Sequence, residues 1–176
     1  MSPPGREEFI AELQRHFDAL YSYSRWITGG GEEAEDFVHD AVERAIGHWS
    51  QFAPGTSMKA WLFTILRRTH LNRIRRSKIE VTSANYPESD DLLPPGPGEG
   101  APGRLPARLV RRDIDAAMSA LSAEHRSMVL LADVEELTRR EIAEIEDIPI
   151  GTVKSRLWRA RIELRKKLME YGGNPE

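Results

Sequence analysis

The side chains best suited to chemistry lie near the C-terminus, in residues 148–168 (IPIGTVKSRLWRARIELRKKL). This stretch carries seven Lys or Arg against a single acid, Glu163, although the whole chain has a formal net charge of −3. Guanidinium and ammonium groups bind phosphates and the edges of guanine bases. Lys154 and Arg156 stand near a predicted helix start, where cations oppose the helix dipole and therefore do not serve local stability. The stretch predicts a nucleic-acid-binding helix; the alternative is a solvated basic face.

The faces of this predicted helix can be separated by spacing. Four apolar residues recur at helical intervals and are expected to pack inward: Val153, Leu157, Ala160 and Leu164. The residues off this stripe are expected to face outward: Lys154, Ser155, Trp158, Arg159 and Arg161. A serine hydroxyl can donate to a base or a phosphate. An exposed tryptophan can stack on a base or sugar. The cations at 165–167 are weaker indicators, because they equally complement the dipole at a helix C-terminus.

Other kinds of chemistry find little support. The chain has no cysteine, and its five histidines (16, 39, 48, 70 and 125) lack the i, i+4 spacing of a zinc helix. No nucleophile–base pair or pair of carboxylates stands out, so we expect no enzymatic activity, no cofactor and no metal. No apolar run approaches the ~20 residues of a membrane span. The first residues lack the pattern of a signal peptide, so we expect a cytoplasmic protein.

The net charge conceals blocks of opposite sign. Residues 32–43 hold six acids and no Lys or Arg, whereas residues 67–78 hold six Lys or Arg and no acid. Residues 80–103 hold five acids and again no Lys or Arg. Such segregation predicts several charged surfaces with different partners.

Helical periodicity predicts three helices in the N-terminal part. The first spans roughly 6–28 and is expected to bury Ile10, Leu13, Phe17, Leu20 and Ile27. The second runs from Ala34 to Trp49 after the break TGGGEE, and the third begins at Trp61 after FAPGTS. Trp61 opens the apolar stripe of the third helix, which favours a core position. No stretch alternates with period 2, so we predict no sheet.

A composition change divides the chain. Residues 80–103 contain five prolines and four glycines, which sustain neither a helix nor a central strand. We therefore predict an all-α protein of two small helical domains, 1–79 and 106–176, joined by an acidic Pro/Gly-rich linker over 80–105.

The C-terminal domain is predicted to contain a helix-turn-helix. A helix over Val110–Leu121 is expected to bury Ile114 and Ala117, and Ser122 is a candidate N-cap for the next helix. Thr138 and Glu141 form a T-x-x-E capping box, which predicts a short helix. A tight turn over 146–148 then leads to Pro149, which suits the start of the basic helix. A short helix, a turn and a longer basic helix make a helix-turn-helix, whose second helix enters the DNA major groove.

Residues 122–161 resemble the promoter −35-binding region of bacterial extracytoplasmic-function sigma factors. The segments AEDFVHDAVERAI and FAPGTSMKAWLFTILRRTHLNRIRR resemble their N-terminal region, in the family's order. The resemblance implies a subunit that binds core RNA polymerase and directs promoter-specific initiation, reading −35 as duplex and melting −10. It implies as partners promoter DNA, the polymerase β′ clamp helices and β flap, and an anti-sigma factor.

The resemblance assigns roles to individual residues. Polymerase docking falls on Asp36, Phe37, Asp40 and Arg44, although Phe37 fits a core position equally well and the acids also suit a helix start. Recognition of −10 falls on Phe52, Lys59, Arg67, Arg68, Asn72 and Arg73, with a loop over 52–58 that captures a flipped base. Contacts to −35 fall on Lys154, Ser155, Trp158 and Arg159, with Arg156 as a phosphate contact. Arg75, Arg76 and Lys78 are expected to grip phosphate, and the linker to thread toward the polymerase active site.

Three positions depart from the family pattern. Arg68 stands where many relatives carry Asn, which bears on the −10 base preference. Asp147 and Glu136 each stand where Gly is frequent, and Asp tolerates a left-handed turn better than most residues.

Two other functions remain open from the sequence. A conventional helix-turn-helix regulator would bind duplex DNA without polymerase, but the N-terminal part carries a basic, aromatic-bearing surface of its own. A decoy that mimics a sigma factor to sequester an anti-sigma factor would not need the DNA-facing cations.

Overall fold

The structure, a computed structural model, describes residues 5–80 and 111–172, with side chains for 5–75 and 111–170. Every regular element in these ranges is a helix, which confirms the predicted all-α class. The chain divides into two compact units: the first contains α1–α4, and the second contains α5, α6, most of α7 and α8. The predicted linker lies almost entirely outside the described residues, so its conformation and the domain limits stay predictions.

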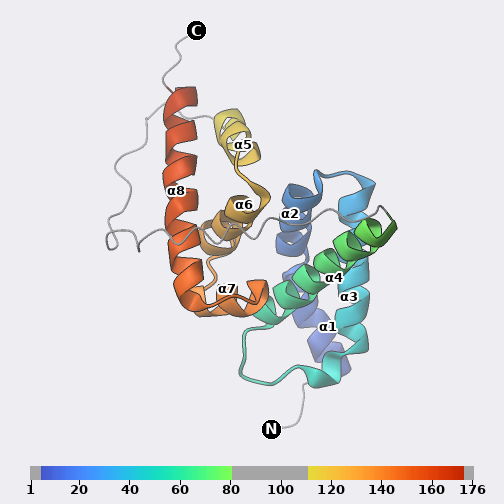
Figure 1. The fold of residues 1–176 in the computed structure, drawn as a ribbon. Helices are drawn as coiled ribbons and strands as arrows, with labels where there is room; N and C mark the ends of the chain where they lie inside the picture. Colours follow the sequence, from blue (N-terminus) through green and yellow to red (C-terminus); the bar gives the residue numbers. More distant parts are fainter. Residues whose placement is uncertain (1–4, 81–110, 173–176) are drawn as a thin grey trace. The chain divides into compact units, whose positions relative to one another are not determined.

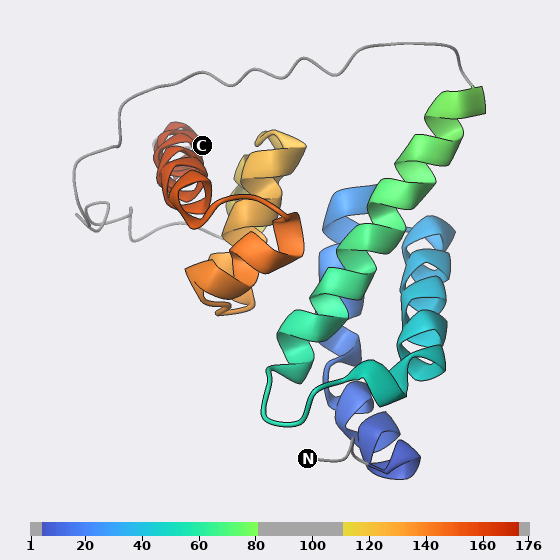
Figure 2. The same ribbon diagram turned by 60° about the horizontal axis from the view of Figure 1, so that its bottom comes forward.

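The N-terminal unit contains α1 (Arg6–Arg15), α2 (Phe17–Thr28), α3 (Glu32–Gly47), the short 3-10 turn η1 (Trp49–Gln51) and α4 (Met58–Glu80). Helix α3 packs along α4, with α2 beside both (Figures 1 and 2). The largest buried side chains between them are Phe9, Leu20, Tyr23, Phe37, Phe63 and Leu66. The ring of Tyr23 meets the ring of Phe63 edge-on, with centroids 5.3 Å apart.

The predicted first helix is in fact two helices. The chain leaves helical geometry at His16, which has φ −100° and ψ −1°, and resumes it at Phe17. This break shifts the phase of the apolar stripe. Phe17, which we expected inside, is 45% exposed, while Phe9 and Tyr23 are buried in its stead. The segment contains no Gly or Pro to mark the break.

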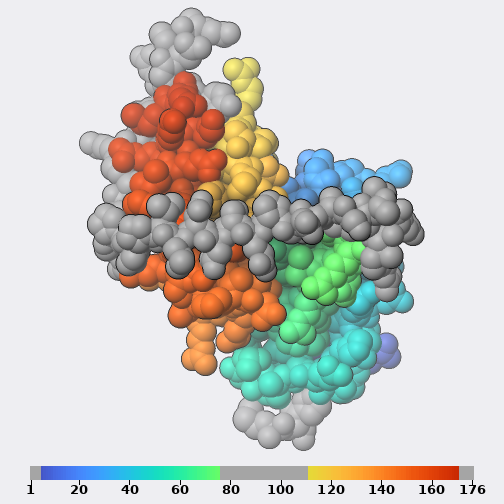
Figure 3. Space-filling view, in the orientation of Figure 1, coloured from blue at the N-terminus to red at the C-terminus, as the bar shows by residue number. Residues whose placement is uncertain are grey.

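The C-terminal unit contains α5 (Arg111–Ser119), α6 (Ala123–Val129), the π-helical turn η2 (Leu130–Val134), α7 (Arg139–Glu146) and α8 (Ile150–Gly172). Helices α5 and α6 lie along α8, and Figure 3 shows α5 (yellow) directly against α8 (red). Ile114 is 45% exposed, so the expectation that it packs inward is wrong; Met118 occupies the interior.

One side chain joins α5 to α6. The guanidinium of Arg126 donates hydrogen bonds to the carbonyl oxygens of Met118, Ser119 and Leu121 at 2.8–2.9 Å. These carbonyls lie at and beyond the C-terminal end of α5, where helix carbonyls lack intrahelical donors. The predicted N-cap is confirmed beside it: the Ser122 hydroxyl accepts from the backbone N–H of His125 at 3.2 Å.

The helix-turn-helix forms as predicted. Thr138 Oγ1 accepts from the Glu141 N–H at 3.3 Å, and Glu141 Oε2 accepts from the Thr138 N–H at 2.8 Å, which is the capping box. Helix α7 ends at Asp147, whose left-handed φ of 54° turns the chain toward α8. Pro149 then precedes α8, and its carbonyl accepts from Val153 N–H at 3.1 Å. Among the described helices, none is both long and apolar enough to cross a bilayer.

Candidate nucleic-acid interfaces

The first half of α8 has one buried face and one basic face. Val153, Leu157 and Ala160 are buried, as their spacing predicted. Lys154 and Trp158 are exposed and lie one turn apart, which puts them on the same side of the helix. Ser155 and Arg159 are half-buried at the same one-turn spacing. The structure thus brings the sequence-predicted residues of α8 together beside the turn, on the part of the helix opposite its packed stripe.

Ser155 and the neighbouring Arg156 both contact other groups of the protein. The Ser155 hydroxyl donates to the Thr152 carbonyl at 3.0 Å, which leaves its oxygen as an acceptor. Arg156 lies 3.9 Å from the Glu124 carboxylate of α6. The contact is long and the Glu124 side chain is exposed, so a phosphate could replace the carboxylate at little cost.

Arg161 is engaged more firmly. Its Nε and Nη2 donate to the two carboxylate oxygens of Asp133 at 3.1 and 2.5 Å, so the pair is bidentate. The hydrogen bonds from Arg161 to Asp133, together with the attraction between the two charges, raise the pKa of Arg161 above its usual value. Arg161 therefore lies off the packed stripe, as its spacing predicted, but its guanidinium is held by Asp133.

A second basic surface lies on α4. Arg68 and Asn72 are exposed one turn apart, and Arg75 follows three residues later on the same side. Leu62, Phe63 and Leu66 are buried on the other sides of this helix. Lys59 and Arg67 are half-exposed and Arg73 is exposed. The side chains of Arg76 and Lys78 lie outside the described residues.

Phe52 supports the loop before α4 from within the core. Its side chain is 8% exposed and its ring centroid lies 6.1 Å from that of Phe9 and 5.6 Å from that of Trp61. The centroids of Phe9 and Trp61 are 5.8 Å apart, so the three rings form one cluster. Phe52 is therefore not available as a surface contact for a base. Trp61 is half-buried in this cluster, in line with its expected core position.

The loop itself is fixed by short-range contacts. Gly55 has a left-handed φ of 84°, and the Thr56 hydroxyl donates to the Ala53 carbonyl at 2.6 Å. Ser57 Oγ accepts from the Ala60 N–H at 3.1 Å and so caps the start of α4. Ala53, Gly55, Thr56 and Ser57 are exposed above the aromatic cluster.

The acidic surface lies on α3. Asp36, Asp40 and Arg44 are exposed at successive one-turn intervals and so share one face. Phe37 is fully buried, with its ring 5.4 Å from the ring of His70 on α4. Phe37 therefore belongs to the core, which was the alternative the sequence left open, and drops out of the docking surface.

His70 is a titratable group held inside the N-terminal unit. Burial lowers the pKa of His70 most, and the positive charges of Arg67 and Arg73 lower it further. Glu33 acts in the opposite direction. The imidazole is therefore biased toward its neutral form.

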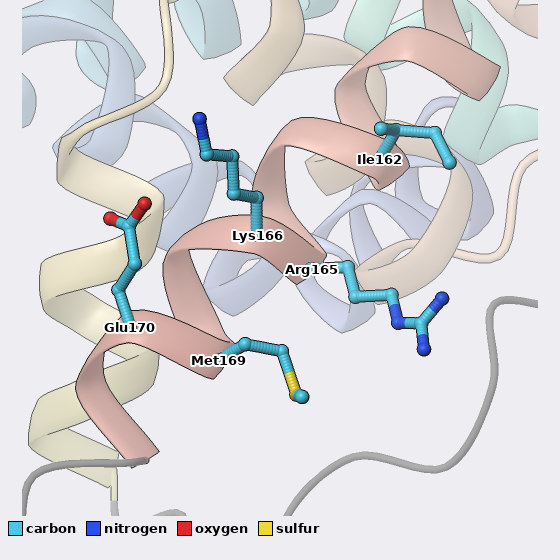
Figure 4. A pocket seen from close by; sticks show the side chains of 5 residues that line it. All are labelled: Ile162, Arg165, Lys166, Met169 and Glu170. Atoms are coloured by element: carbon cyan, nitrogen blue, oxygen red, sulfur yellow. The ribbon is translucent and has the colours of Figure 1, made fainter.

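The second half of α8 carries an open hollow that the sequence did not indicate. Its lining residues are Ile162, Arg165, Lys166, Met169 and Glu170 (Figure 4). Lys166 and Glu170 project to one side of the helix, and Ile162 and Arg165 to the other. Ile162 and Met169 are exposed apolar side chains, so this surface differs in chemistry from the basic face at the start of α8.

Two family models match the chain in the predicted order. The model of sigma-70 region 2 matches residues 13–79, and the model of sigma-70 region 4 matches residues 111–164. The chain is 30% identical over 167 residues to the ECF RNA polymerase sigma factor EcfG of Rhodopseudomonas palustris, covering 95% of this chain and 86% of that protein. The chain belongs to the extracytoplasmic-function (ECF) family of sigma factors. Sigma factors direct transcription initiation and are not themselves enzymes.

This sigma factor is similar to further sigma factors, both in sequence and in structure. It is 30% identical over 170 residues to the ECF sigma factor SigW of Bacillus subtilis, covering 94% of this chain and 91% of SigW. It is also similar to the sigma factor RpoE of Bartonella quintana, solved in complex with the anti-sigma factor NepR. That similarity has a TM-score of 0.70 and 30% identity, and covers 92% of this chain and 97% of the other.

Sequence reasoning missed the residues outside α8 that form ion pairs with it. Asp133 and Glu124 were not singled out, because an acid gives no sign of its partner until the fold is known. Phe9 was missed for another reason: the unmarked break at His16 changed which residues of the first segment face inward.

Proposed function

We propose that this sigma factor binds core RNA polymerase and directs promoter-specific initiation, reading −35 as duplex and melting −10. The observation that carries the proposal is the capped helix-turn-helix, whose second helix presents Lys154 and Trp158 to solvent beside the turn. In such a motif the start of the second helix meets the base edges of the major groove. The family membership and the order of the two regions support it.

The −35 contact would use the start of α8. Lys154 and Arg159 bind base edges or phosphates, and the Ser155 oxygen accepts a hydrogen bond from a base amino group. Trp158 supplies apolar area for a thymine methyl or a sugar. Arg156 would exchange the long Glu124 contact for a phosphate.

The −10 contact would use α4 and the loop before it. Arg68, Asn72 and Arg73 are exposed and offer donors to a displaced strand, and Lys59 lies near the helix start. The loop over 53–57 would receive the flipped base above the Phe9–Phe52–Trp61 cluster. Holding the single strand offsets the loss of stacking and pairing when duplex DNA opens. Phe52 acts in this scheme by supporting the loop.

Docking on polymerase would use the exposed face of α3. Asp36 and Asp40 present carboxylates and Arg44 a guanidinium two turns along the same face. A basic patch on the clamp helices of β′ would suit the acids, and the β flap would bind the C-terminal unit. The acidic linker would thread into channels that otherwise hold nucleic acid, since it carries the same sign of charge. Deleting residues 88–100 should impair initiation and spare binding to core polymerase.

Control by an anti-sigma factor is the further part of the proposal. The similar RpoE of Bartonella quintana was solved in complex with the anti-sigma factor NepR, which supports a protein inhibitor of that class for this chain. Co-purification from cells followed by inhibition of transcription in vitro would test it.

One experiment tests the function as a whole. The pure protein is added to core polymerase and a promoter library, and the transcripts are sequenced. Sequence-specific starts that require both components support the proposal. Specific duplex binding without core polymerase would favour a conventional regulator. Activity in neither assay, with tight binding to an anti-sigma factor, would favour a decoy.

A further inference from the structure

The spacing of α8 places Arg161 with the DNA-facing residues. Lys154, Trp158 and Arg161 follow one another at intervals of four and three residues, so they form one stripe. From sequence alone, Arg161 would be counted as a third contact on that stripe. In the structure its guanidinium is instead joined to Asp133 by two hydrogen bonds, at 3.1 and 2.5 Å.

A bidentate pair fixes direction as well as distance. The guanidinium is planar and its donors form a rigid fork, so two bonds to one carboxylate set the orientation of both groups. Asp133 lies in the π turn η2, between Leu130 and Leu131, which are buried, and Glu135, whose N–H donates to the Leu130 carbonyl at 2.9 Å. The carboxylate is thus mounted on an anchored segment.

Two further pairs join α8 to α6. His125 Nδ1 lies 2.6 Å from the Glu163 carboxylate, and Arg156 lies 3.9 Å from Glu124. Of the three pairs, Asp133–Arg161 alone is bidentate and lies on the Trp158 stripe. The buried stripe of α8 decides which face points inward, and this fork restrains rotation about the helix axis.

We infer that Asp133 and Arg161 are positioning residues for −35 recognition: their fork sets the direction in which Trp158 projects, and Arg161 does not itself contact DNA. The inference rests on the proposed function. It separates Arg161 from the neighbouring cations of the same helix by its geometry. It also gives Asp133, an acid near a DNA-binding face, a positive role in binding.

The direction in which one substitution changes the affinity for DNA distinguishes a positioning role of Arg161 from a direct contact. Asp133→Asn removes a negative charge near the DNA and frees the guanidinium. If Arg161 were a phosphate contact, or if only net charge mattered, binding would tighten. If the fork positions α8, binding to the −35 element should weaken roughly tenfold, about the effect of losing one good base contact. Asp133→Glu keeps the charge but displaces the fork, and it should also weaken binding.

The measurement is the affinity of holoenzyme for the best promoter from the library, with and without an intact −35 element, over a range of salt. Lys154→Ala is the matched control: it should lower the salt slope by about one, as loss of a phosphate contact does. Arg161→Gln and Asp133→Asn should leave the slope unchanged. The double variant should lose no more than either single variant, because the residues act as one unit.

Tighter binding by Asp133→Asn, or a slope for Arg161→Gln that falls as it does for Lys154→Ala, would overturn the inference. Wild-type holoenzyme that ignores the −35 element would instead overturn the proposed function. Circular dichroism of each variant tests whether its helical content is retained. If Asp133→Asn loses helicity, the comparison of Asp133→Glu with Lys154→Ala decides the question.

Discussion

Glu136 and Asp147 both have positive φ, of 56° and 54°, one before α7 and one after it. They are the two non-glycine residues of positive φ in the described parts of the chain. Glycine adopts positive φ without a steric penalty, whereas side chains with a Cβ disfavour it, so both turns form against a backbone preference. The turn before α8 is therefore under local strain.

Glycine at these positions should stabilise the C-terminal unit. Glu136→Gly should raise the free energy of unfolding by roughly 0.5–1 kcal/mol, because the relieved strain exceeds the added freedom of the unfolded chain. Asp147→Gly should gain less, since Asp tolerates this conformation better. The urea dependence of amide hydrogen exchange in α7 and α8 measures both changes in the free energy of unfolding. Glu144→Gly, inside α7, is the control and should lower stability by about 1 kcal/mol; equal losses at 136 and 144 would disprove the strain.

The N-terminal unit should lose stability in mild acid through His70. Because the pKa of His70 is lowered in the folded state, the unfolded state binds more protons below pH 6.5. The neutral imidazole contributes to the free energy of unfolding. This contribution is fully present above pH 6.5 and is lost as the pH falls through the folded-state pKa of His70. His70→Gln should flatten the fall in unfolding free energy between about pH 7 and 5. His39→Gln, an exposed site on α3, is the control; an unchanged pH slope in His70→Gln would exclude this role.

Removing Arg126 should loosen the junction of α5 and α6. Arg126→Met keeps the aliphatic stem and removes the hydrogen bonds to three carbonyls. We expect a loss of roughly 2–3 kcal/mol in unfolding free energy, since bonds from a charged donor are among the stronger ones. Arg111→Met is the control, because its pair with Asp115 is exposed and 3.9 Å long. It should change stability by less than about 0.5 kcal/mol.

Phe52 should affect promoter opening through stability of the loop. Phe52→Ala should lower the free energy of unfolding by roughly 3–5 kcal/mol, as for a buried aromatic ring, and Phe52→Leu should lower it considerably less. Permanganate footprinting of −10 should then track the stability of the two variants. Arg68→Ala is the counterpart on the exposed face: it should alter −10 opening and leave stability within about 0.5 kcal/mol. If Phe52→Leu is as stable as the wild type but no longer opens −10, the Phe52 ring must contact DNA directly.

The sequence predicted elements wherever a local rule acts. The capping box at Thr138 and Glu141, the N-cap at Ser122 and the buried stripe from Val153 to Ala160 all depend on residues within a turn of one another. These rules are short-ranged, and they located the helix-turn-helix correctly. The exposed residues at the start of α8 followed from the same periodicity, whereas those on α3 were assigned from the family resemblance.

Features that depend on distant residues were not predictable. The break at His16 has no local signal, and it leaves Phe17 exposed while Phe9 is buried. The π turn at Leu130–Val134 shifts the chain by one residue and brings Asp133 to Arg161, 28 positions away. Phe37 and Phe52 lie in regions that carry function in the family, and only packing separates a supporting ring from a contacting one.

The ring cluster also bears on how the N-terminal unit can be isolated. Similarity to sigma-70 region 2 begins at residue 13, which makes that position an inviting start for a fragment. Such a fragment would lack Phe9, one of the three rings that pack beside the loop over 53–57. Phe52 and Trp61 would each lose a neighbour and expose apolar surface to water. A fragment meant to retain DNA binding should therefore begin before α1.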